Sequence, residues 1–390
     1  MSKPTILILI GHYLPGTLTG GPVRSVSNLV DWLGDEFDFR ILTADRDQGD
    51  SAPYLQVRAG EWYSVGKAQV RYLTPAERQL FALGAVLRAT RHDLLIVESV
   101  LARTSIFALL LRRLGLLRRA PILITPRGHL GQGALQQKSA KKTLFLRAVR
   151  LLGLYRGLEW CATSDGERAE IVEQFGQGEA PRIHVIPNLP ARAVSTGSVT
   201  RPPKRAGALR LIFLSRISRK KNLHFALEAL RGLTGEVEFD VYGSLEDAAY
   251  WAECQAISGS LPAHIRVCYQ GVAPFDGAVE VLAGYHLFYL PTLSENFGHA
   301  IWEALVADCP VLISDQTPWT DINAYGAGWA LPLDSLAGFT HALQQVIDLD
   351  AAAYAALVAQ VSRYREHYQA RGNPADALRG LLRELSGSTP

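Results

Sequence analysis

The chain has 390 residues, of which 48% are hydrophobic and 20% are charged. This composition excludes a disordered or fibrous protein, and the length suits two domains of roughly 150 to 200 residues each. The formal net charge of +3 says little about partners, and no apolar run reaches the length of about 18 residues that a membrane-spanning helix needs. Four cysteines without a metal-binding pattern indicate reduced thiols, and no signal peptide is evident, so we expect a cytoplasmic protein.

The first predicted element is a short buried strand, TILILI, at residues 5–10. A loop follows it, and Pro22 suits the first position of a helix whose apolar residues recur at helical spacing. Gly20 and Gly21 lie immediately before that helix. Two interpretations are open for them: a turn in a surface loop, or a stretch of bare backbone that approaches a phosphate closely.

Further strands are expected in the first half of the chain, with helical patterns between most of them. They lie at 38–43, 69–73, 94–98, 121–125, 159–163 and 183–187. Alternation of strand and helix indicates βαβ units and a parallel sheet. Arg127 and His129 stand in the turn after the fourth of these strands. Each is a candidate ligand of a phosphate, and a solvated loop side chain is the alternative.

Residues 99–158 contain twelve Lys and Arg and no Asp or Glu. Interleaved Leu, Ile and Phe give basic amphipathic helices, which predict contact with an anionic membrane surface. A basic face that is merely solvated is the alternative. Nucleic acid is not expected as a partner, because no DNA- or RNA-binding motif accompanies the charge. Such contact would place the protein peripherally on the inner face of the cytoplasmic membrane.

Residues 191–208 lose hydrophobic periodicity and gain Pro, Gly, Ser and Thr, which is typical of a linker. A strand at 209–215 opens the second domain, and Arg216 and Lys221 stand five residues apart across the turn that follows. Both can reach one anion over the carboxyl end of the sheet. A further strand leads into a glycine turn at Gly243.

The stretch from Pro291 to Ser314 reads as a strand end, a polar turn, a short helix and a second strand. Ser294 and Asn296 suit a helix N-cap, so the next backbone N–H groups are expected to face an anion such as a diphosphate. These groups belong to Phe297, Gly298, His299 and Ala300. Glu295 beside them suits neutral hydroxyls, and a sugar nucleotide offers both chemistries. Alternatively, Glu295 complements the helix dipole and Glu303 is a solvated helix residue.

The stretch SENFGHAIWEALVADCPVLIS resembles the signature of the retaining GT-B glycosyltransferases of family 4, in which Glu-x7-Glu precedes a small-residue turn, a proline and a hydrophobic strand. The matching residues are Glu295, Phe297, Gly298, Glu303, Ala304 and Pro310. Asp308 and Cys309 stand where the family commonly has a small residue and glycine. Arg216 and Lys221 resemble the family's diphosphate clamp, with Asn222 in place of the usual glycine.

The resemblance implies an α/β protein of GT-B type, in which two Rossmann-like domains with parallel sheets face each other across a cleft. The implied acceptor-side domain spans 1–190, and the linker spans 191–208. The implied nucleotide-sugar domain spans 209–370. A last helix, within 371–390, is expected to cross back onto the first domain.

The resemblance also implies transfer of a sugar, with retention of configuration, from a nucleoside-diphosphate sugar to a saccharide acceptor. The acceptor is expected to be a lipid-linked intermediate of cell-surface polysaccharide synthesis. Implied catalytic residues are Glu295, Arg216, Lys221, Arg127 and His129, and the counterpart of the family's histidine is open between the last two. Implied donor-binding residues are Gly20, Gly21, Gly243, Asn296, Phe297, Gly298, His299 and Glu303. No metal or other cofactor is expected.

Two functions from other classes remain open. GT-B architecture also serves sugar-nucleotide epimerases, and a non-catalytic, membrane-associated nucleotide-binding protein would share the fold. Donor turnover without an acceptor would indicate the epimerase, and binding without turnover would indicate the non-catalytic protein.

Overall fold

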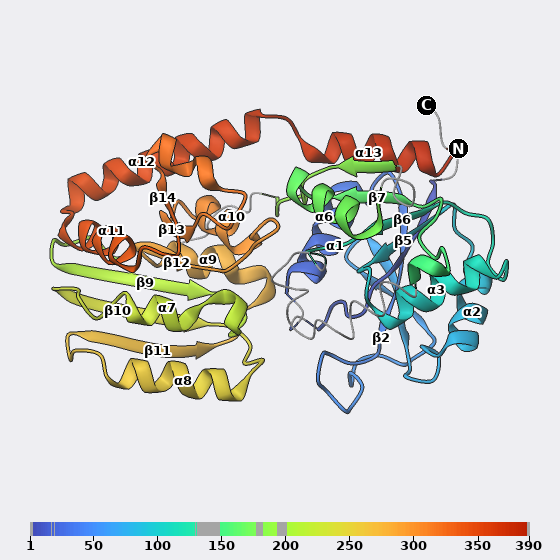
Figure 1. Ribbon diagram of the computed structural model, residues 1–390, viewed down its shortest axis with the longest axis horizontal. Coiled ribbons are helices and arrows are strands. Elements are labelled where there is room, and N and C mark those ends of the chain that lie inside the picture. The colour runs from blue at the N-terminus through green and yellow to red at the C-terminus, as the bar shows by residue number, and fades with distance from the viewer. Residues whose placement is uncertain are drawn as a thin grey trace. The chain divides into compact units, whose positions relative to one another are not determined.

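The computed structural model describes residues 3–16, 18, 20–128, 130, 149–176, 182–192 and 201–387. The chain forms two compact units, which we call unit 1 (Met1–Pro190 with Asn373–Pro390) and unit 2 (Ala191–Gly372) (Figure 1). His129, all three lysines of the basic segment 99–158 (Lys138, Lys141 and Lys142), and positions 193–200 of the expected linker lie outside the described residues.

Unit 1 is built on an eight-stranded sheet with the order β3-β4-β2-β1-β5-β6-β7-β8, counted over the described residues. The strands are β1 (Thr5–Leu9), β2 (Asp38–Ala44), β3 (Trp62–Val65), β4 (Ala68–Leu73), β5 (Leu94–Glu98), β6 (Ile122–Thr125), β7 (Glu159–Ala162) and β8 (Arg182–Val185). Every residue of β5 and β6 is buried, as in a parallel sheet that is covered on both faces. The strands expected from the sequence are thus confirmed, with small shifts at their ends.

Strand β3 is not among the expected elements, and it is the strand that pairs antiparallel in this sheet. The chain reverses between β3 and β4 through Gly66 and Lys67, and Gly66 has a φ of 56°. A two-residue hairpin loop with positive φ favours glycine at that place. The four residues of β3 alternate between exposed and half-buried positions, so they give too weak a hydrophobic pattern for prediction.

The helices of unit 1 include one from the far end of the chain. Those in the described part of the unit are α1 (Gly21–Leu33), α2 (Leu80–Ala89), α3 (Arg103–Arg113), α6 (Asp165–Phe175) and α13 (Pro374–Leu385). Helix α13 contacts α1, and Arg379 and Arg383 each donate a hydrogen bond of 2.7 Å to the carboxylate of Glu36. The C-terminal segment therefore packs as part of unit 1.

Where the structure describes unit 2, the unit contains a six-stranded sheet, all parallel, with the order β11-β10-β9-β12-β13-β14. Its strands are β9 (Ala208–Leu214), β10 (Glu236–Tyr242), β11 (Ile265–Gly271), β12 (Leu287–Leu290), β13 (Val311–Ser314) and β14 (Gly328–Leu331). Its helices are η1 (Arg219–Lys221), α7 (Leu223–Glu228), α8 (Ala248–Gly259), η2 (Phe275–Gly277), α9 (Ala278–Ala283), α10 (His299–Val306), η3 (Thr320–Tyr325), α11 (Leu336–Asp348) and α12 (Ala351–Ala370). The order places β9 and β12 side by side in the middle of the sheet.

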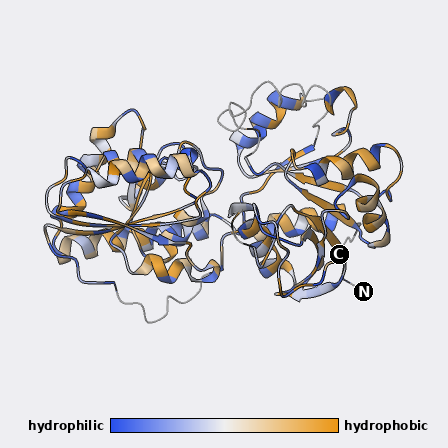
Figure 2. Ribbon diagram, turned by 90° about the horizontal axis from the view of Figure 1, so that it is seen from below, coloured by the Kyte–Doolittle hydropathy of each residue, from blue (hydrophilic) through white to orange (hydrophobic). Residues whose placement is uncertain are grey.

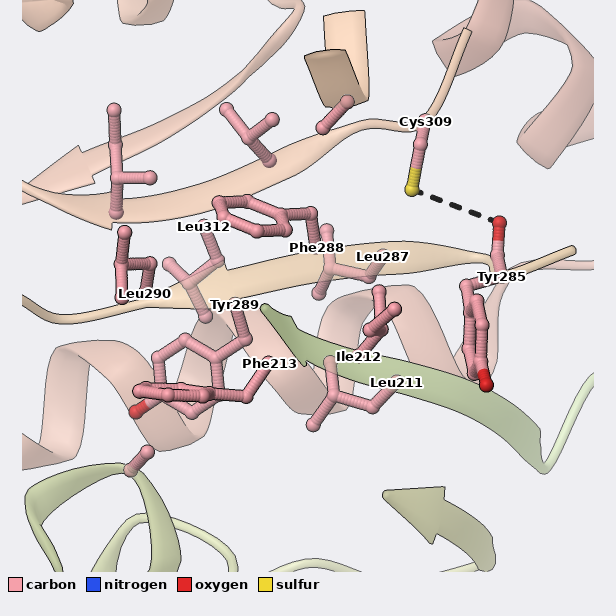
Figure 3. Close-up of a cluster of buried hydrophobic side chains, with 14 of the residues drawn as sticks. Leu211, Ile212, Phe213, Tyr285, Leu287, Phe288, Tyr289, Leu290, Cys309 and Leu312 are labelled. Carbon is pink, nitrogen blue, oxygen red and sulfur yellow. Dashed lines mark hydrogen bonds between the residues drawn. The ribbon is translucent and has the colours of Figure 1, made fainter. Parts of the chain in front are cut away.

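The core of unit 2 lies along these central strands, where the ribbon is coloured as hydrophobic, with helices on both sides of the sheet (Figure 2). Figure 3 shows Phe213 of β9 and Tyr289 of β12 packed near each other. Both side chains are fully buried, and full burial of a large apolar side chain contributes about 1.5–3 kcal/mol. This rigid centre fixes the positions of the turns that leave β9 and β12.

The turn between α10 and β13 carries Asp308 and Cys309 in place of the family's usual small residue and glycine. Asp308 adopts a φ of 51°, a left-handed conformation that glycine adopts most easily. Its carboxylate accepts hydrogen bonds from Arg365 at 2.7 Å and Ser362 at 2.8 Å. These bonds offset the backbone strain. Next to it, the buried Cys309 contributes a thiol 3.6 Å from the carbonyl oxygen of Tyr285 (Figure 3).

Candidate functional site

The turn after β9 carries Arg216 and Lys221, two of the predicted site residues. Lys221 ends η1 and is 7% exposed, and Asn222 follows it with a φ of 63°. Asparagine tolerates this left-handed conformation better than most residues, which explains how it replaces glycine here. Its side-chain Nδ2 also donates a hydrogen bond of 3.0 Å to the carbonyl oxygen of Pro291, at the end of β12.

The turn after β12 is tied directly to the turn after β9. The backbone N–H of Leu293 donates to the carbonyl oxygen of Lys220 at 2.8 Å, and the hydroxyl of Thr292 donates to the same oxygen at 3.1 Å. Together with the bond of Asn222, these contacts hold the two turns at a fixed separation. Because β9 and β12 are parallel neighbours, both turns lie at the carboxyl edge of the sheet, where open α/β sheets bind ligands.

Lys221 and Glu295, which lie 74 positions apart in the chain, meet in this region. Nζ of Lys221 donates a hydrogen bond to Oε1 of Glu295, and the two side chains are only 9% and 14% exposed. The N–H of Glu295 donates to the carbonyl oxygen of Gln316 at 2.9 Å, which fixes the backbone at that position. This largely buried ion pair places a cation and a carboxylate next to each other at the carboxyl edge of the sheet.

Arg216, the other predicted clamp residue, forms an ion pair with Glu246. Nη1 of Arg216 lies 2.6 Å from Oε1 of Glu246, and the side chains are 36% and 28% exposed. Glu246 comes from the segment after β10, and it is not among the residues expected from the sequence. A signal for it exists only in the fold: the turn after β10 lies beside the turn after β9, because these strands are neighbours.

The helix that follows Glu295 begins later than expected. Gly298, with a φ of 78°, is the N-cap of α10, and it has no side chain to cap the helix. The prediction of a cap by Ser294 or Asn296 is therefore wrong, because the left-handed backbone at Gly298 starts the helix two residues beyond Asn296. The first helical N–H groups belong to His299 and Ala300. They lie at the same edge of the sheet as Glu295.

The remaining residues predicted in this stretch are mostly buried. Phe297 is 4% exposed, its ring packs on His299 and Trp319, and its carbonyl oxygen accepts a hydrogen bond from the indole of Trp319. Its side chain thus belongs to the core. Glu303, 5% exposed, lies one helical turn after His299 on the same face of α10. It is therefore a buried carboxylate, in contrast to the solvated one of the alternative interpretation.

Gly243 lies where β10 ends, and the space around it explains the residue type. A Cβ atom built at this position would lie 1.8 Å from the carbonyl oxygen of Ser215, at the end of β9. The backbone N–H of Gly243 donates to the carbonyl oxygen of Gly271 at 2.8 Å, and the carbonyl oxygen of Gly243 accepts a hydrogen bond of 2.8 Å from the hydroxyl of Tyr269. Glycine therefore allows close approach of three neighbouring backbone segments.

In unit 1, Gly20 and Gly21 lie at the start of α1. Gly20 is the N-cap with a φ of 62°, and a Cβ at Gly21 would meet no atom within 4 Å. Helix α1 therefore starts from an open stretch of backbone at the carboxyl end of β1. The two interpretations from the sequence differ only in whether a ligand occupies this opening.

Arg127 is held by groups of its own unit. Its Nε and Nη2 donate to the two carboxylate oxygens of Glu98 at 2.7 and 2.9 Å, and its Nη1 donates to the side chain of Asn188. Burial alone would lower the pKa of this guanidinium, but the charge and hydrogen bonds of Glu98 raise it above its usual value. Arg127 therefore ties together the chain after β5, β6 and β8. His129 lies outside the described residues.

The backbone beside Arg127 is fixed by a second buried carboxylate that the sequence analysis does not single out. Glu167, 3% exposed, accepts hydrogen bonds from the N–H of Gly128 at 2.6 Å and the N–H of Thr163 at 2.7 Å. The sequence does hold a signal for it, since Ser164 and Glu167 have the spacing of a capping box at the start of α6. The turn at 126–128 is therefore rigid.

The described residues contain no group of three or more His, Cys, Asp or Glu that could hold a metal ion. Two Asp-x-Asp triplets occur in the sequence, at 45–47 and 348–350. Asp45 is paired with Arg46 at 2.8 Å, and Asp350 caps α12 through the N–H of Ala353. Both triplets thus have structural partners.

In the described ranges, no single helix has the length and apolar character to cross a membrane. The segments Leu336–Asp348 and Ala351–Leu385 are long and apolar enough only when taken together, and they are bent by 120° relative to each other.

Both halves of the chain match family models of glycosyl transferases. Residues 20–189 match the family model described as "Glycosyl transferase 4-like domain", and residues 200–361 match "Glycosyl transferases group 1". A comparison with curated proteins finds no match.

Many solved structures are similar. Sucrose-phosphate synthase from Thermosynechococcus elongatus has a TM-score of 0.72 and 16% identity, covering 99% of this chain and 100% of that chain. The Anabaena protein HepE, in complex with UDP and glucose, has a TM-score of 0.68 and 16% identity, with coverage of 98% and 100%. WaaG, a glycosyltransferase involved in lipopolysaccharide biosynthesis, has a TM-score of 0.65 and 13% identity, with coverage of 95% and 98%.

At these identities the solved structures show the fold, and the two family models show the family. They confirm the resemblance carried by the Glu-x7-Glu motif and the GT-B fold that it implies. The chain belongs to the GT-B glycosyltransferases that combine a glycosyl transferase 4-like domain with a glycosyl transferases group 1 domain.

Proposed function

We propose that the protein transfers a sugar from a nucleoside-diphosphate sugar to a saccharide acceptor with retention of configuration and without a metal ion. The observation that carries this proposal is the meeting of Lys221 and Glu295 at the carboxyl edge of the unit 2 sheet, next to the start of α10. One group suits the phosphates of the donor, and the other suits sugar hydroxyls.

The roles follow from charge. Arg216 and Lys221 neutralise the leaving nucleoside diphosphate, which is the task that a metal ion performs in other transferases. The N–H groups at the start of α10 add a partial positive charge on the same side. HepE, which has the same fold, was solved with UDP and glucose. A diphosphate donor for this chain agrees with that finding.

Glu295 binds hydroxyls of the transferred sugar, and its carboxylate lies near the positive charge that develops at the anomeric carbon. The ion pair with Lys221 orients the carboxylate of Glu295 before the donor arrives. Glu303 binds the ribose hydroxyls. Gly243 allows the base to pack against bare backbone, and Asn296, Gly298 and His299 border the sugar and diphosphate.

In unit 1, Gly20 and Gly21 border the acceptor with open backbone at the start of α1. Arg127 acts as a positioning residue, because Glu98 and Asn188 already bind its guanidinium. By holding the ends of three strands together, it shapes the acceptor side of the unit. His129, two residues on, is then the candidate for direct contact with the sugar.

We propose further that the acceptor is lipid-linked and that unit 1 docks on an anionic membrane surface. Leu114, Leu116, Leu151 and Leu152 are exposed by 40% or more. Several arginines lie among them and are themselves exposed or half-buried: Arg112, Arg113, Arg118, Arg119, Arg150 and Arg156. A hydrogen bond from Arg112 to the carbonyl oxygen of Gly157, 3.3 Å long, links the two leucine segments.

Exposed leucines among arginines suit a membrane interface, where the apolar groups enter the lipid and the cations meet headgroups. WaaG, similar in fold, is involved in lipopolysaccharide biosynthesis. Four free cysteines agree with work in the reducing cytoplasm, at the inner membrane face. Sedimentation with anionic vesicles tests this part: Leu151→Ser/Leu152→Ser should release the protein, and unchanged sedimentation would remove these residues from the contact.

The donor site is tested by titrating UDP, GDP, ADP, dTDP and CMP into wild type and Arg216→Ala, without added metal. A ligand at a hundred times its dissociation constant stabilises the fold by about 2.7 kcal/mol, which thermal unfolding detects easily. We expect one diphosphate to stabilise wild type and to lose most of this effect in the variant. If none of them binds, the proposed function is wrong.

A further inference from the structure

Three arginines gather at the carboxyl edge of the unit 1 sheet, apart from the predicted donor residues. Arg46 lies just beyond the end of β2, Arg78 stands in the turn after β4, and Arg103 begins α3 after β5. The order β4-β2-β1-β5 brings these strands together, and all of them are parallel. The three positions therefore share the edge of the sheet where ligands bind in this class of fold.

Of these three arginines, only Arg46 has a carboxylate partner among the described residues. Asp45 accepts two hydrogen bonds from Arg46, at 2.8 and 3.3 Å. Arg78 is half-buried, and within the described part of the chain no carboxylate forms an ion pair with it. Arg103 is exposed, and its guanidinium lies over the ring of Phe107 at 5.5 Å. Two of the three guanidinium groups, those of Arg78 and Arg103, thus have no carboxylate partner in the described part of the chain.

The positive charges of Arg103 and Arg46 act on the guanidinium of Arg78. Burial lowers the pKa of its guanidinium first, the charges of Arg103 and Arg46 lower it further, and Asp45 opposes them. A half-buried cation that faces other cations is costly, and an anionic ligand removes that cost.

The turn that carries Arg78 is held in place by its neighbours. Thr74 and Glu77 form a reciprocal pair: the N–H of Glu77 donates to the hydroxyl of Thr74 at 3.2 Å, and the N–H of Thr74 donates to Glu77 at 3.0 Å. Arg71 donates to the same carboxylate at 2.9 Å. This places Arg78 in a fixed position at low entropic cost, which is how a binding residue is preorganised.

We propose that Arg46, Arg78 and Arg103 form a subsite for a phosphate group of the acceptor. A phosphate monoester or diphosphate carries about two negative charges near pH 7, which matches the two guanidinium groups that pair with no described carboxylate, and guanidinium groups bind phosphate oxygens through paired N–H donors. The inference rests on the proposed function, because it describes the acceptor of that reaction. The phosphate can belong to a free sugar phosphate or to the diphosphate of a lipid-linked saccharide.

The experiment uses full-length protein saturated with the nucleoside diphosphate that binds best, so that the donor clamp is filled. Glucose 6-phosphate and geranyl diphosphate are titrated by calorimetry, with methyl glucoside as the neutral control and methyl glucuronide as the carboxylate control. The variants are Arg78→Gln and Arg103→Gln. Arg91→Gln is the matched control, because Arg91 is an exposed arginine of the same unit that precedes β5 and so lies at the opposite edge of the sheet.

We expect wild type and Arg91→Gln to bind a phosphate compound with equal affinity. Arg78→Gln and Arg103→Gln should each bind it about tenfold more weakly. Preference for glucose 6-phosphate would identify a free sugar phosphate, and preference for geranyl diphosphate would identify a lipid-linked one. Thermal unfolding of each variant checks the fold, and the exposed Arg103 keeps the test valid if Arg78→Gln unfolds.

Three outcomes overturn the inference: neither phosphate compound binds, both variants bind as wild type does, or only methyl glucuronide binds. In each case the nucleoside diphosphate still binds, and the proposed function stands. Failure of every nucleoside diphosphate to bind would instead refute the proposed function, and that result comes from the first step of the experiment.

Discussion

Replacement of Glu246 by glutamine is expected to tighten the binding of the nucleoside diphosphate. In the structure the guanidinium of Arg216 is paired with Glu246, with Nη1 and Oε1 2.6 Å apart. We propose the same guanidinium as a ligand of the diphosphate, so the donor must displace Glu246 or bind next to its negative charge. Glutamine keeps the size of the side chain and removes the charge.

The magnitude follows from the exposure of the pair. Arg216 and Glu246 are 36% and 28% exposed, so solvent screens the interaction, and pairs of this kind contribute about 0.2–1 kcal/mol. Since about 1.4 kcal/mol corresponds to a tenfold change in affinity, loss of the competing charge should tighten binding by about 1.4- to 5-fold. Stability should change by no more than the same small amount.

Calorimetric titration of wild type, Glu246→Gln and Glu253→Gln measures this effect. Glu253 is the matched control, because it pairs with the neighbouring Arg219 at 2.7 Å, and we propose no donor role for either residue. The gain of Glu246→Gln should shrink at high salt, which screens exposed charges. Weaker or unchanged binding at low salt would refute the reasoning and show that Glu246 supports Arg216 instead of competing for it.

Three further substitutions test the site and the turns around it. Glu295→Gln should abolish sugar transfer but keep or tighten diphosphate binding, because Lys221 loses its internal anion; loss of binding in calorimetry would contradict the separate roles. Gly243→Ala should destabilise unit 2 by more than about 2 kcal/mol in urea unfolding, because its Cβ would overlap a backbone oxygen, whereas Gly271→Ala, with φ of 79° but open space, should cost only about 1–2 kcal/mol. Asp308→Gly should be less destabilising than Asp308→Ala in the same assay, since glycine relieves the left-handed strain; the reverse order would show that the strain is negligible.

Unit 2 was largely predictable because its sequence signals are local. Buried apolar runs predict β9 and β12. Arg216, Lys221 and Glu295 stand in the turns after these two strands, where the pattern of apolar and polar residues changes sharply. The carboxyl edge of a parallel sheet then gathers these turns without further information. The departure at Asp308 is also visible in the sequence, although its compensation by Arg365 is not.

The rest depends on contacts between distant segments. The position of Gly298 as N-cap was missed because Ser294 and Asn296 are better capping residues by type, and only the left-handed backbone at Gly298 decides where α10 begins. Glu246 was missed because its importance comes from the adjacency of β9 and β10, not from a motif.

Asn222 shows how a departure from a family pattern can preserve a site. Glycine at this position would satisfy the left-handed backbone, but it would offer no side chain to the neighbouring turn. Asparagine tolerates the same backbone and adds the hydrogen bond from its Nδ2 to the carbonyl oxygen of Pro291. This bond joins the turn of Lys221 to the turn of Glu295, alongside the two bonds that the carbonyl oxygen of Lys220 accepts. The substitution therefore strengthens the link between the two charged residues, and the pair is held ready before any donor binds.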